Sequence, residues 1–223
     1  MVLAATKELA ADEDMAKGFL ITFEGIDFSG KSVQATLLRD ALVDLDFPVL
    51  FLREPGGTEI SEKIRQVLLD TQHALMYKKT ELLLYSAARA QIVSERIAPS
   101  LDRGQVVVCD RYFDSTTAYQ GYGRQIDLDF IDKLHSFVAD KIEPNLTFLI
   151  DLDPEEALKR KKATTVEKDR LDRETVEFHM RVRDGYLQIA RTESKRFVTI
   201  DGSRPIQVIH QQILDETKRR LKL

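Results

Sequence analysis

The fold of this 223-residue chain is decided by the stretch Gly25-Ile26-Asp27-Phe28-Ser29-Gly30-Lys31-Ser32. This stretch matches the pattern of a phosphate-binding loop, or P-loop, G-x-x-x-x-G-K-[ST]. Residues 19–23 before it form an apolar run typical of a buried parallel strand, and residues 33–42 after it carry apolar side chains at helical spacing. Strand, glycine loop and helix therefore follow one another in the order that a P-loop requires.

Two glycines suit this loop to phosphate binding. Gly25 and Gly30 permit the backbone to curl, so that its N–H groups converge on phosphate oxygens at the N-terminus of the following helix. Lys31 would then reach the terminal phosphates of a nucleotide, and the Ser32 hydroxyl would ligate Mg²⁺. The alternative is a glycine-rich turn that matches the pattern by chance. The flanking strand and helix patterns favour the P-loop.

Length and composition fit one compact α/β domain, because the chain has 223 residues and 43% hydrophobic content. A net charge of −4 argues against a protein that coats nucleic acid, and no apolar stretch approaches the roughly 18 to 20 residues of a membrane span. We therefore expect neither nucleic acid nor a membrane as a partner. The single cysteine, Cys109, lies in an apolar run and indicates a core thiol in a reducing compartment, the cytoplasm.

The first 17 residues are expected to form a flexible or weakly helical extension, and residues 18–223 the folded domain. The acidic residues Glu8, Asp12, Glu13 and Asp14 do not belong in a secretion or transit signal. Met15 is an alternative start of the chain.

Strand and helix patterns alternate along the rest of the chain. Apolar runs predict strands at residues 19–23, 48–52, 105–109, 146–152 and 196–200. Helical patterns begin near Lys31, Glu59, Thr80, Leu128, Pro154, Arg173 and Pro205. This alternation implies a five-stranded parallel sheet with right-handed crossovers. Ligands of such sheets bind beyond the carboxyl ends of the strands, so the residues that follow each strand are the candidates for function.

Two of these strand ends carry charged residues. After the second strand comes Arg53-Glu54-Pro55-Gly56-Gly57-Thr58, whose Pro-Gly-Gly core alone predicts a tight turn. Arg53, next to a P-loop strand, is also well placed to hold a phosphate. Asp110 ends the third strand, where P-loop enzymes orient the magnesium shell; the weaker alternative is a cap for the segment that follows.

Two further segments are ambiguous by themselves. Tyr85 and Arg89 share one face of the long helical segment 81–101, and a stacking ring beside an arginine suits a nucleoside monophosphate. Without other information, a surface salt bridge explains Arg89 better. Residues 112–124 are dense in hydroxyls and aromatic rings, which can bind a base and a sugar but are also ordinary in a surface loop.

Taken together, these segments resemble bacterial thymidylate kinases. The matching segments are Phe23-Glu24-Gly25-Ile26-Asp27, Arg53 to Thr58, Tyr85 with Arg89, Asp110-Arg111-Tyr112, and Ala118-Tyr119-Gln120-Gly121. Each motif also occurs in other P-loop kinases, whereas the set is specific, and the resemblance runs from Gly18 to the C-terminus.

The resemblance implies a P-loop NTPase fold, a three-layer α/β sandwich with a small lid at about residues 159–172. It implies the reaction ATP + dTMP giving ADP + dTDP, with Mg²⁺ as the cofactor, and a cytoplasmic homodimer. Residues Gly25, Ile26, Asp27, Phe28, Ser29, Gly30, Lys31 and Ser32 would bind ATP, and Ser32 and Asp110 would hold the metal. The loop at residues 201–205 would lie along the adenine ring.

The same resemblance assigns roles around the acceptor. Arg53, Arg89 and Arg111 would surround the phosphate of dTMP, and Asp27 would approach its sugar hydroxyl. Tyr85 would stack on thymine, and Ser115, Thr116, Tyr119 and Gln120 would line the base and sugar. The catalytic residues would be Asp27, Lys31, Arg111, Arg160 and Arg170, of which the last two belong to the expected lid.

One departure from the family concerns the P-loop. Phe28 stands where some thymidylate kinases have an arginine and many have a small residue. A phenylalanine facing the phosphates would be awkward, so we expect its ring to point toward the lid or the sheet edge. If the transferring phosphoryl group still requires an arginine, Arg160 or Arg170 must supply it.

Two other classes of P-loop protein are alternatives to a thymidylate kinase. A GTPase would need an N-K-x-D sequence to read guanine, and none occurs in the chain. A deoxynucleoside kinase, which phosphorylates a 5′-hydroxyl, remains the alternative, although the Glu54-Pro55-Gly56-Gly57 context suits the monophosphate enzyme better.

Overall fold

The computed structural model describes residues 18–164, 169–171 and 174–223, and it contains one parallel sheet. The strand order is β2-β3-β1-β4-β5. The strands are β1 (Phe19–Glu24), β2 (Val49–Arg53), β3 (Val106–Asp110), β4 (Leu146–Asp151) and β5 (Phe197–Asp201). Each predicted strand is confirmed to within one residue at either end. The expected N-terminal extension lies outside the described residues.

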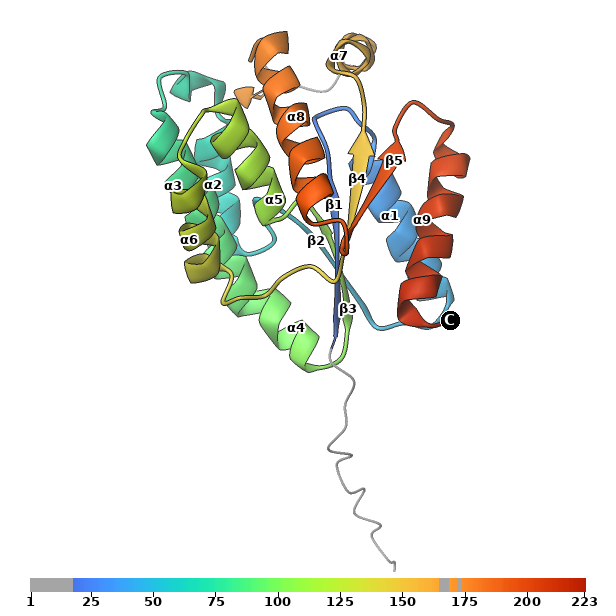
Figure 1. Ribbon diagram of the computed structural model, residues 1–223. Helices are drawn as coiled ribbons and strands as arrows, with labels where there is room; N and C mark the ends of the chain where they lie inside the picture. The colour runs from blue at the N-terminus through green and yellow to red at the C-terminus, as the bar shows by residue number, and fades with distance from the viewer. Residues whose placement is uncertain (1–17, 165–168, 172–173) are drawn as a thin grey trace, which may run out of the picture.

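Helices cover both faces of the sheet, as Figure 1 shows. They are α1 (Lys31–Asp44), α2 (Glu59–Leu69), α3 (Lys78–Ile92), α4 (Ala98–Asp102), α5 (Phe113–Thr116), α6 (Leu128–Val138), α7 (Pro154–Lys162), α8 (Val176–Thr192) and α9 (Ile206–Leu221). Helices α1 and α9 pack on one face, and α8 with the α2–α6 region packs on the other. The predicted three-layer α/β sandwich is therefore confirmed.

Alternation along β1 builds the two halves of the core. Ile21 and Phe23 pack with Leu38 of α1 and Ile213 of α9, whereas Leu20 faces the opposite layer. A strand that is covered on both faces must be apolar along its whole length, which is why the predicted strands were continuous apolar runs.

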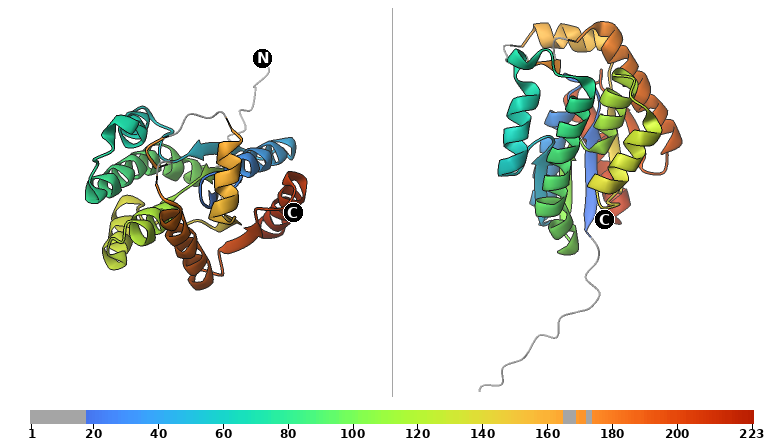
Figure 2. Two further views of the ribbon diagram at one scale, coloured as in Figure 1. Left: turned by 90° about the horizontal axis from the view of Figure 1, so that it is seen from above. Right: turned by 90° about the vertical axis from the view of Figure 1, so that its left-hand side faces the viewer.

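The sheet register brings the predicted site residues to one edge. Phe23 of β1 lies opposite Asp110 of β3, and Asp110 lies opposite Arg53 of β2. The P-loop, Asp110 and Arg53 thus follow three adjacent strands at their carboxyl ends. Seen from above, α7 crosses this same edge (Figure 2).

The structure corrects the surface-loop interpretation of residues 112–124. Residues Phe113–Thr116 form α5, and Thr117–Gly123 continue it as a π-helical segment, η3. The pattern hid this helix because Gly121 and Gly123 are poor helix formers. Here they allow close packing. A Cβ on Gly123 would lie 2.7 Å from the Phe178 ring of α8, and a Cβ on Gly185 of α8 would lie 2.6 Å from the Tyr122 ring.

Smaller differences occur at helix ends. The helix expected near Thr80 begins at Lys78, and the one expected near Arg173 begins at Val176, where the Thr175 hydroxyl accepts the Phe178 N–H at 3.2 Å. Of the expected lid, the structure describes residues 159–164 and 169–171. Among the described helices, none is long and apolar enough to cross a membrane.

Candidate active site

The P-loop has the backbone geometry that its glycines permit. Gly25 and Gly30 adopt φ values of 140° and 99°, and a Cβ on Gly25 would meet the Ile150 carbonyl oxygen at 2.5 Å. Helix α1 begins at Lys31 directly after the loop. The buried Lys31 Nζ lies 3.6 Å from Asp27 Oδ1 and 3.4 Å from the Ile26 carbonyl oxygen. A compact cationic cradle therefore faces the edge of the sheet.

Phe28 points away from this cradle, as expected. Its ring lines a small cavity with Pro154, Ala157 and Leu158 of α7, and the Lys161 Nζ lies 5.9 Å from the ring centroid. The backbone of Phe28 has a φ of 63°, in the left-handed region that L side chains rarely adopt. Packing against α7 compensates for that strain.

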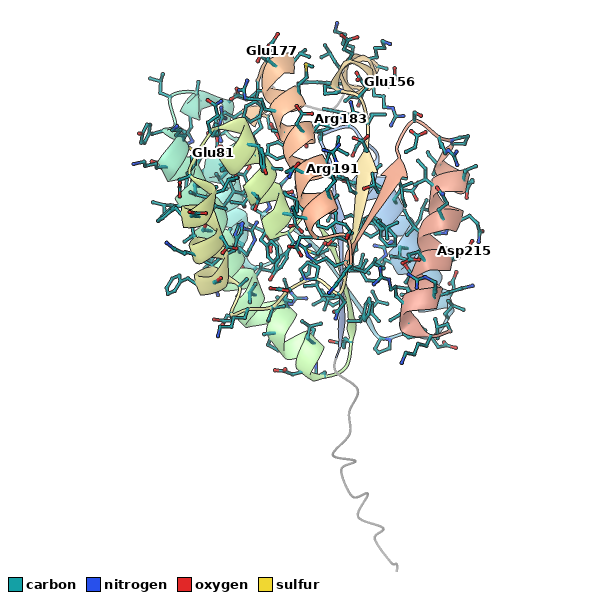
Figure 3. All side chains as sticks on the ribbon, in the orientation of Figure 1. Glu81, Glu156, Glu177, Arg183, Arg191 and Asp215 are labelled. Carbon is teal, nitrogen blue, oxygen red and sulfur yellow. The ribbon has the colours of Figure 1, made fainter. Side chains whose placement is uncertain are left out.

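The two lid arginines lie in different places. Arg160 donates to the carbonyl oxygens of Ser29 at 3.3 Å and Gly202 at 2.8 Å, so its guanidinium lies beside the P-loop. Arg170 is buried, with Nη2 only 2.6 Å from Glu81 Oε2 and Nε donating to the Leu68 carbonyl oxygen. Glu81 lies toward the upper end of the molecule in Figure 3, the end where the strands finish. In this conformation, Arg160 contacts the P-loop, whereas Arg170 contacts Glu81 and the end of α2.

Asp110 fits the expected magnesium shell. Its carboxylate is buried, and Oδ1 has no hydrogen-bond partner among the described residues. A buried carboxylate oxygen without a partner is costly, and such oxygens are the ligands that Mg²⁺ prefers. Ser32 lies at the first turn of α1. No group of three His, Cys, Asp or Glu side chains among the described residues is arranged to hold a metal ion.

A second pocket opens beside the P-loop, and we call it the acceptor pocket. Its charged lining residues are Asp27, Glu54, Arg65, Arg111 and Asp169; its other lining residues are Pro55, Leu69, Tyr85, Ser115, Thr116, Tyr119, Gln120 and Leu171. Because Asp27 belongs to both the P-loop and this pocket, the two sites adjoin. Six predicted substrate residues line the pocket besides Asp27: Tyr85, Arg111, Ser115, Thr116, Tyr119 and Gln120.

Arg111 is fixed from several sides. Nη2 donates to Asp27 Oδ1 at 2.5 Å, and Nη1 lies 3.0 Å from the Gly25 carbonyl oxygen. The Tyr119 hydroxyl donates to the other oxygen of Asp27 at 2.9 Å. Burial alone would raise the pKa of Asp27, but the charges of Arg111 and Lys31 overcome it and hold that pKa well below its ordinary value. Asp27 is therefore an ionised anchor for both cations.

The surface interpretation of Arg89 is wrong. Arg89 is 2% exposed, and its Nε donates to Glu54 Oε2 at 2.7 Å while Nη1 donates to Thr116 Oγ1 at 2.9 Å. It reaches the acceptor pocket through these two residues, both of which line it. A charge buried this deeply requires such partners, and none of them is near Arg89 in the sequence.

The structure places Arg53 differently from the expectation and brings Arg65 to the pocket. Arg53 pairs with Glu62 at 2.9 Å and is not part of the pocket lining. Arg65, which the sequence did not single out, lines the pocket and donates to the Pro55 carbonyl oxygen at 3.0 Å. Its position on one face of α2 gives no hint of this contact until the helix is placed on the sheet.

Two buried carboxylates were also not anticipated. Glu81 accepts hydrogen bonds from Gln120 at 2.9 Å and Arg124 at 3.0 Å, and so fixes the amide of a pocket residue. Glu24 accepts from the Tyr112 N–H, the Ser115 hydroxyl and the Tyr186 hydroxyl. Burial, with the nearby charge of Asp114, raises the pKa of Glu24 to about 7.

Comparison with known proteins identifies the family. The family model of thymidylate kinase matches residues 23–213. The chain belongs to the thymidylate kinase family. A thymidylate kinase of Sulfurihydrogenibium is 47% identical over 91% of this chain and 98% of the relative, and one of Pelodictyon phaeoclathratiforme is 48% identical over 87% and 93%. The crystal structure of thymidylate kinase from Ehrlichia chaffeensis is similar, with a TM-score of 0.73 at 35% identity over 91% of this chain and 99% of that one.

Membership in the thymidylate kinase family confirms the resemblance on which the site assignments rest. The chain is an enzyme that phosphorylates dTMP. Nothing in these matches favours the deoxynucleoside kinase alternative.

The pKa of Glu24 generates a prediction about stability. Because the pKa is near 7 in the folded chain and 4.5 in an unfolded one, the folded state binds more protons between these values. The contribution of Glu24 to stability is therefore full below pH 4.5 and is lost as pH rises through 7, by at most about 3 kcal/mol. Denaturant unfolding of Glu24→Gln from pH 5 to pH 8 should show a flatter pH dependence than the unmodified chain. Exposed Glu143→Gln is the matched control, and a parallel pair of curves would contradict the assignment.

Proposed function

We propose that the chain transfers the γ-phosphoryl group of ATP, bound as its Mg²⁺ complex, to the phosphate of dTMP, giving ADP and dTDP. The observation that carries this proposal is the contact between two phosphate sites. Asp27 lies in the P-loop and lines the acceptor pocket, and Arg111 bonds both Asp27 and the Gly25 carbonyl oxygen. Phosphoryl transfer requires donor and acceptor to be held in line, so adjoining sites supply the main catalytic requirement.

The donor side is assigned to the P-loop. Residues 25–32 would bind the ATP phosphates through their backbone N–H groups, and Lys31 would neutralise charge on the transferring group. Ser32 and Asp110 would hold Mg²⁺, which offsets negative charge on the phosphates when bound. The Oδ1 of Asp110, which has no hydrogen-bond partner in the part of the chain that the structure describes, supports this role.

The acceptor side is assigned to the second pocket. Arg111, helped by Arg65, would bind the phosphate of dTMP, because arginines in this pocket offer charge-assisted hydrogen bonds. Tyr85 would lie against the thymine ring and Gln120 against its edge. Arg89 holds Glu54 and Thr116 in place.

We also propose that the enzyme is a cytoplasmic homodimer. Leu83 on α3 and Phe130 on α6 are 54% and 51% exposed, and they line one groove on the surface. Apolar side chains gathered in this way suit a contact with a second copy. The free, buried thiol of Cys109 suits a reducing compartment.

A choice of acceptors tests the reaction directly. We expect ADP release to depend on dTMP and to be absent with thymidine, because thymidine lacks the phosphate that Arg111 would bind. A coupled ADP-release assay with ATP, Mg²⁺ and each acceptor measures this. Turnover with thymidine as the acceptor would contradict the proposal and favour a deoxynucleoside kinase.

Lys31→Ala should lower kcat by roughly 100-fold or more while changing the Kd for dTMP little. The reason is that Lys31 would act on charge that develops in the transition state of the donor phosphate. Steady-state kinetics and calorimetry provide the two values. Exposed Lys63→Ala is the control, and a Lys31→Ala enzyme with near-normal kcat would exclude the P-loop mechanism.

Arg160 and Arg170 lie in different places, so we expect their substitution to have different effects. Arg160→Ala should lower kcat by roughly 10³-fold at saturating substrates, because Arg160 already lies beside the P-loop and would stabilise the transferring phosphoryl group. Arg170→Ala should mainly lower thermal stability, because it leaves the buried Glu81 with one partner fewer.

The control for these variants is Arg191→Ala, an exposed arginine on α8 far along the helix from its upper end (Figure 3). If the Arg160→Ala/Arg170→Ala double variant kept full kcat, the lid would not supply the catalytic arginine, and Arg53 would become the better candidate.

A further inference from the structure

Glu24 is a buried charge that the reaction does not explain. It is the last residue of β1, it is 0% exposed, and it does not line the acceptor pocket. Its Oε1 accepts the Tyr112 N–H at 2.7 Å, and its Oε2 accepts the hydroxyls of Ser115 at 2.6 Å and Tyr186 at 3.0 Å. Burying a carboxylate is costly even with three donors, so its place in the fold calls for a reason.

The first contact holds the backbone at Arg111. Arg111 has a φ of 72°, in the left-handed region that an arginine rarely adopts. Its own N–H donates to the Phe23 carbonyl oxygen at 3.0 Å, and the next N–H, that of Tyr112, donates to Glu24. Two consecutive residues of β1 therefore clamp the strained residue and decide where its side chain leaves the backbone.

The other two contacts set the direction of the hydroxyl groups. Ser115 Oγ and Tyr186 Oη lie 3.0 Å and 3.1 Å from Arg111 Nη1, which can only donate. Each hydroxyl has one proton, and Glu24 Oε2 accepts from both, so their lone pairs remain directed at the guanidinium. The two oxygens lie 2.8 Å apart, and the carboxylate draws both protons away from the bond that they could otherwise form with each other.

One edge of Arg111 remains available. Nη1 and Nη2 make all of its side-chain hydrogen bonds to the described residues, and Nε makes none of them. The side chain is 15% exposed and lines the acceptor pocket. Because Nη1 and Nη2 are held by hydrogen bonds within the protein, the guanidinium presents its Nε–H to a ligand in one orientation.

We propose that Glu24 is a positioning residue for Arg111: it clamps the backbone and orients the hydroxyls of Ser115 and Tyr186, so that the Nε edge of Arg111 meets the phosphate of dTMP. This inference rests on the proposed function, because it takes that phosphate as the ligand of Arg111. Glu24 itself touches no reacting atom.

Two variants test the proposal by calorimetry with dTMP and with thymidine at pH 8. Glu24→Gln keeps an acceptor for the Tyr112 N–H, but its amide would donate to the two hydroxyls and turn their protons toward Arg111. We expect it to weaken dTMP binding roughly tenfold, about the value of one hydrogen bond to a charged group, and to leave thymidine binding unchanged. Tyr186→Phe removes one hydroxyl and should cause a smaller loss of the same kind. Tyr122→Phe in η3 is the matched control.

A double-mutant comparison tests whether the effect passes through Arg111. In an Arg111→Ala background, Glu24→Gln should cause no further loss of dTMP affinity, because its target is gone. A further tenfold loss there would overturn the proposal. So would an equal loss for dTMP and thymidine, since this would indicate only general damage to the fold.

The remaining outcomes separate the inference from the proposed function. If the unmodified chain bound dTMP no more tightly than thymidine, the proposed function itself would fail. If it favoured dTMP but both variants kept that preference, the role of Glu24 would be wrong and the reaction would stand. If Glu24→Gln did not fold, Tyr186→Phe would decide, because it leaves the buried carboxylate in place.

Discussion

The parallel pairing of β1 with β3 is the constraint on which the site depends. It sets Phe23 opposite Asp110, so that the P-loop after one strand and Arg111 after the other leave the sheet side by side. The ion pair between Arg111 and Asp27 then closes the gap between them. A shift of one residue in this register would turn the side chains of one strand to the opposite faces of the sheet and separate the P-loop from the acceptor pocket. The apolar cores on either side of the sheet therefore fix the spacing of the P-loop and the acceptor pocket.

Charge in this site is organised in layers. Asp27 pairs with Lys31 and Arg111 between the P-loop and the acceptor pocket, and the charges of both keep it ionised. Beneath it, Glu24 accepts hydrogen bonds from groups that surround Arg111. This arrangement lets Lys31 and Arg111 lie close together before a ligand binds. An enzyme that brings two polyanions into contact needs positive charge concentrated in this way.

Local patterns predicted much of this arrangement, and long-range pairs account for what they missed. The local sequence of residues 19–32 predicts their structure, because it contains an apolar run, glycines that permit unusual backbone angles, and a helix start. The residues around Arg89 do not predict its ion pair with Glu54, which is 35 positions away, or its hydrogen bond with Thr116. A surface location was the reasonable expectation for such a charge. Likewise, Arg65 and Glu24 acquire their surroundings only when β1, α2 and η3 come together.

The close contact between α8 and η3 has a consequence for motion in the enzyme. Gly185 and Gly123 leave no room for a Cβ, so the Tyr122 and Phe178 rings lock each helix against the other. The wall that carries Tyr119 and Gln120 must then move with α8 as one rigid body. Helix α7 is fastened differently, by Phe28 and by the carbonyl contacts of Arg160, which are easily exchanged for water or for a ligand. The wall of the acceptor pocket is therefore held more rigidly than helix α7 beside the P-loop.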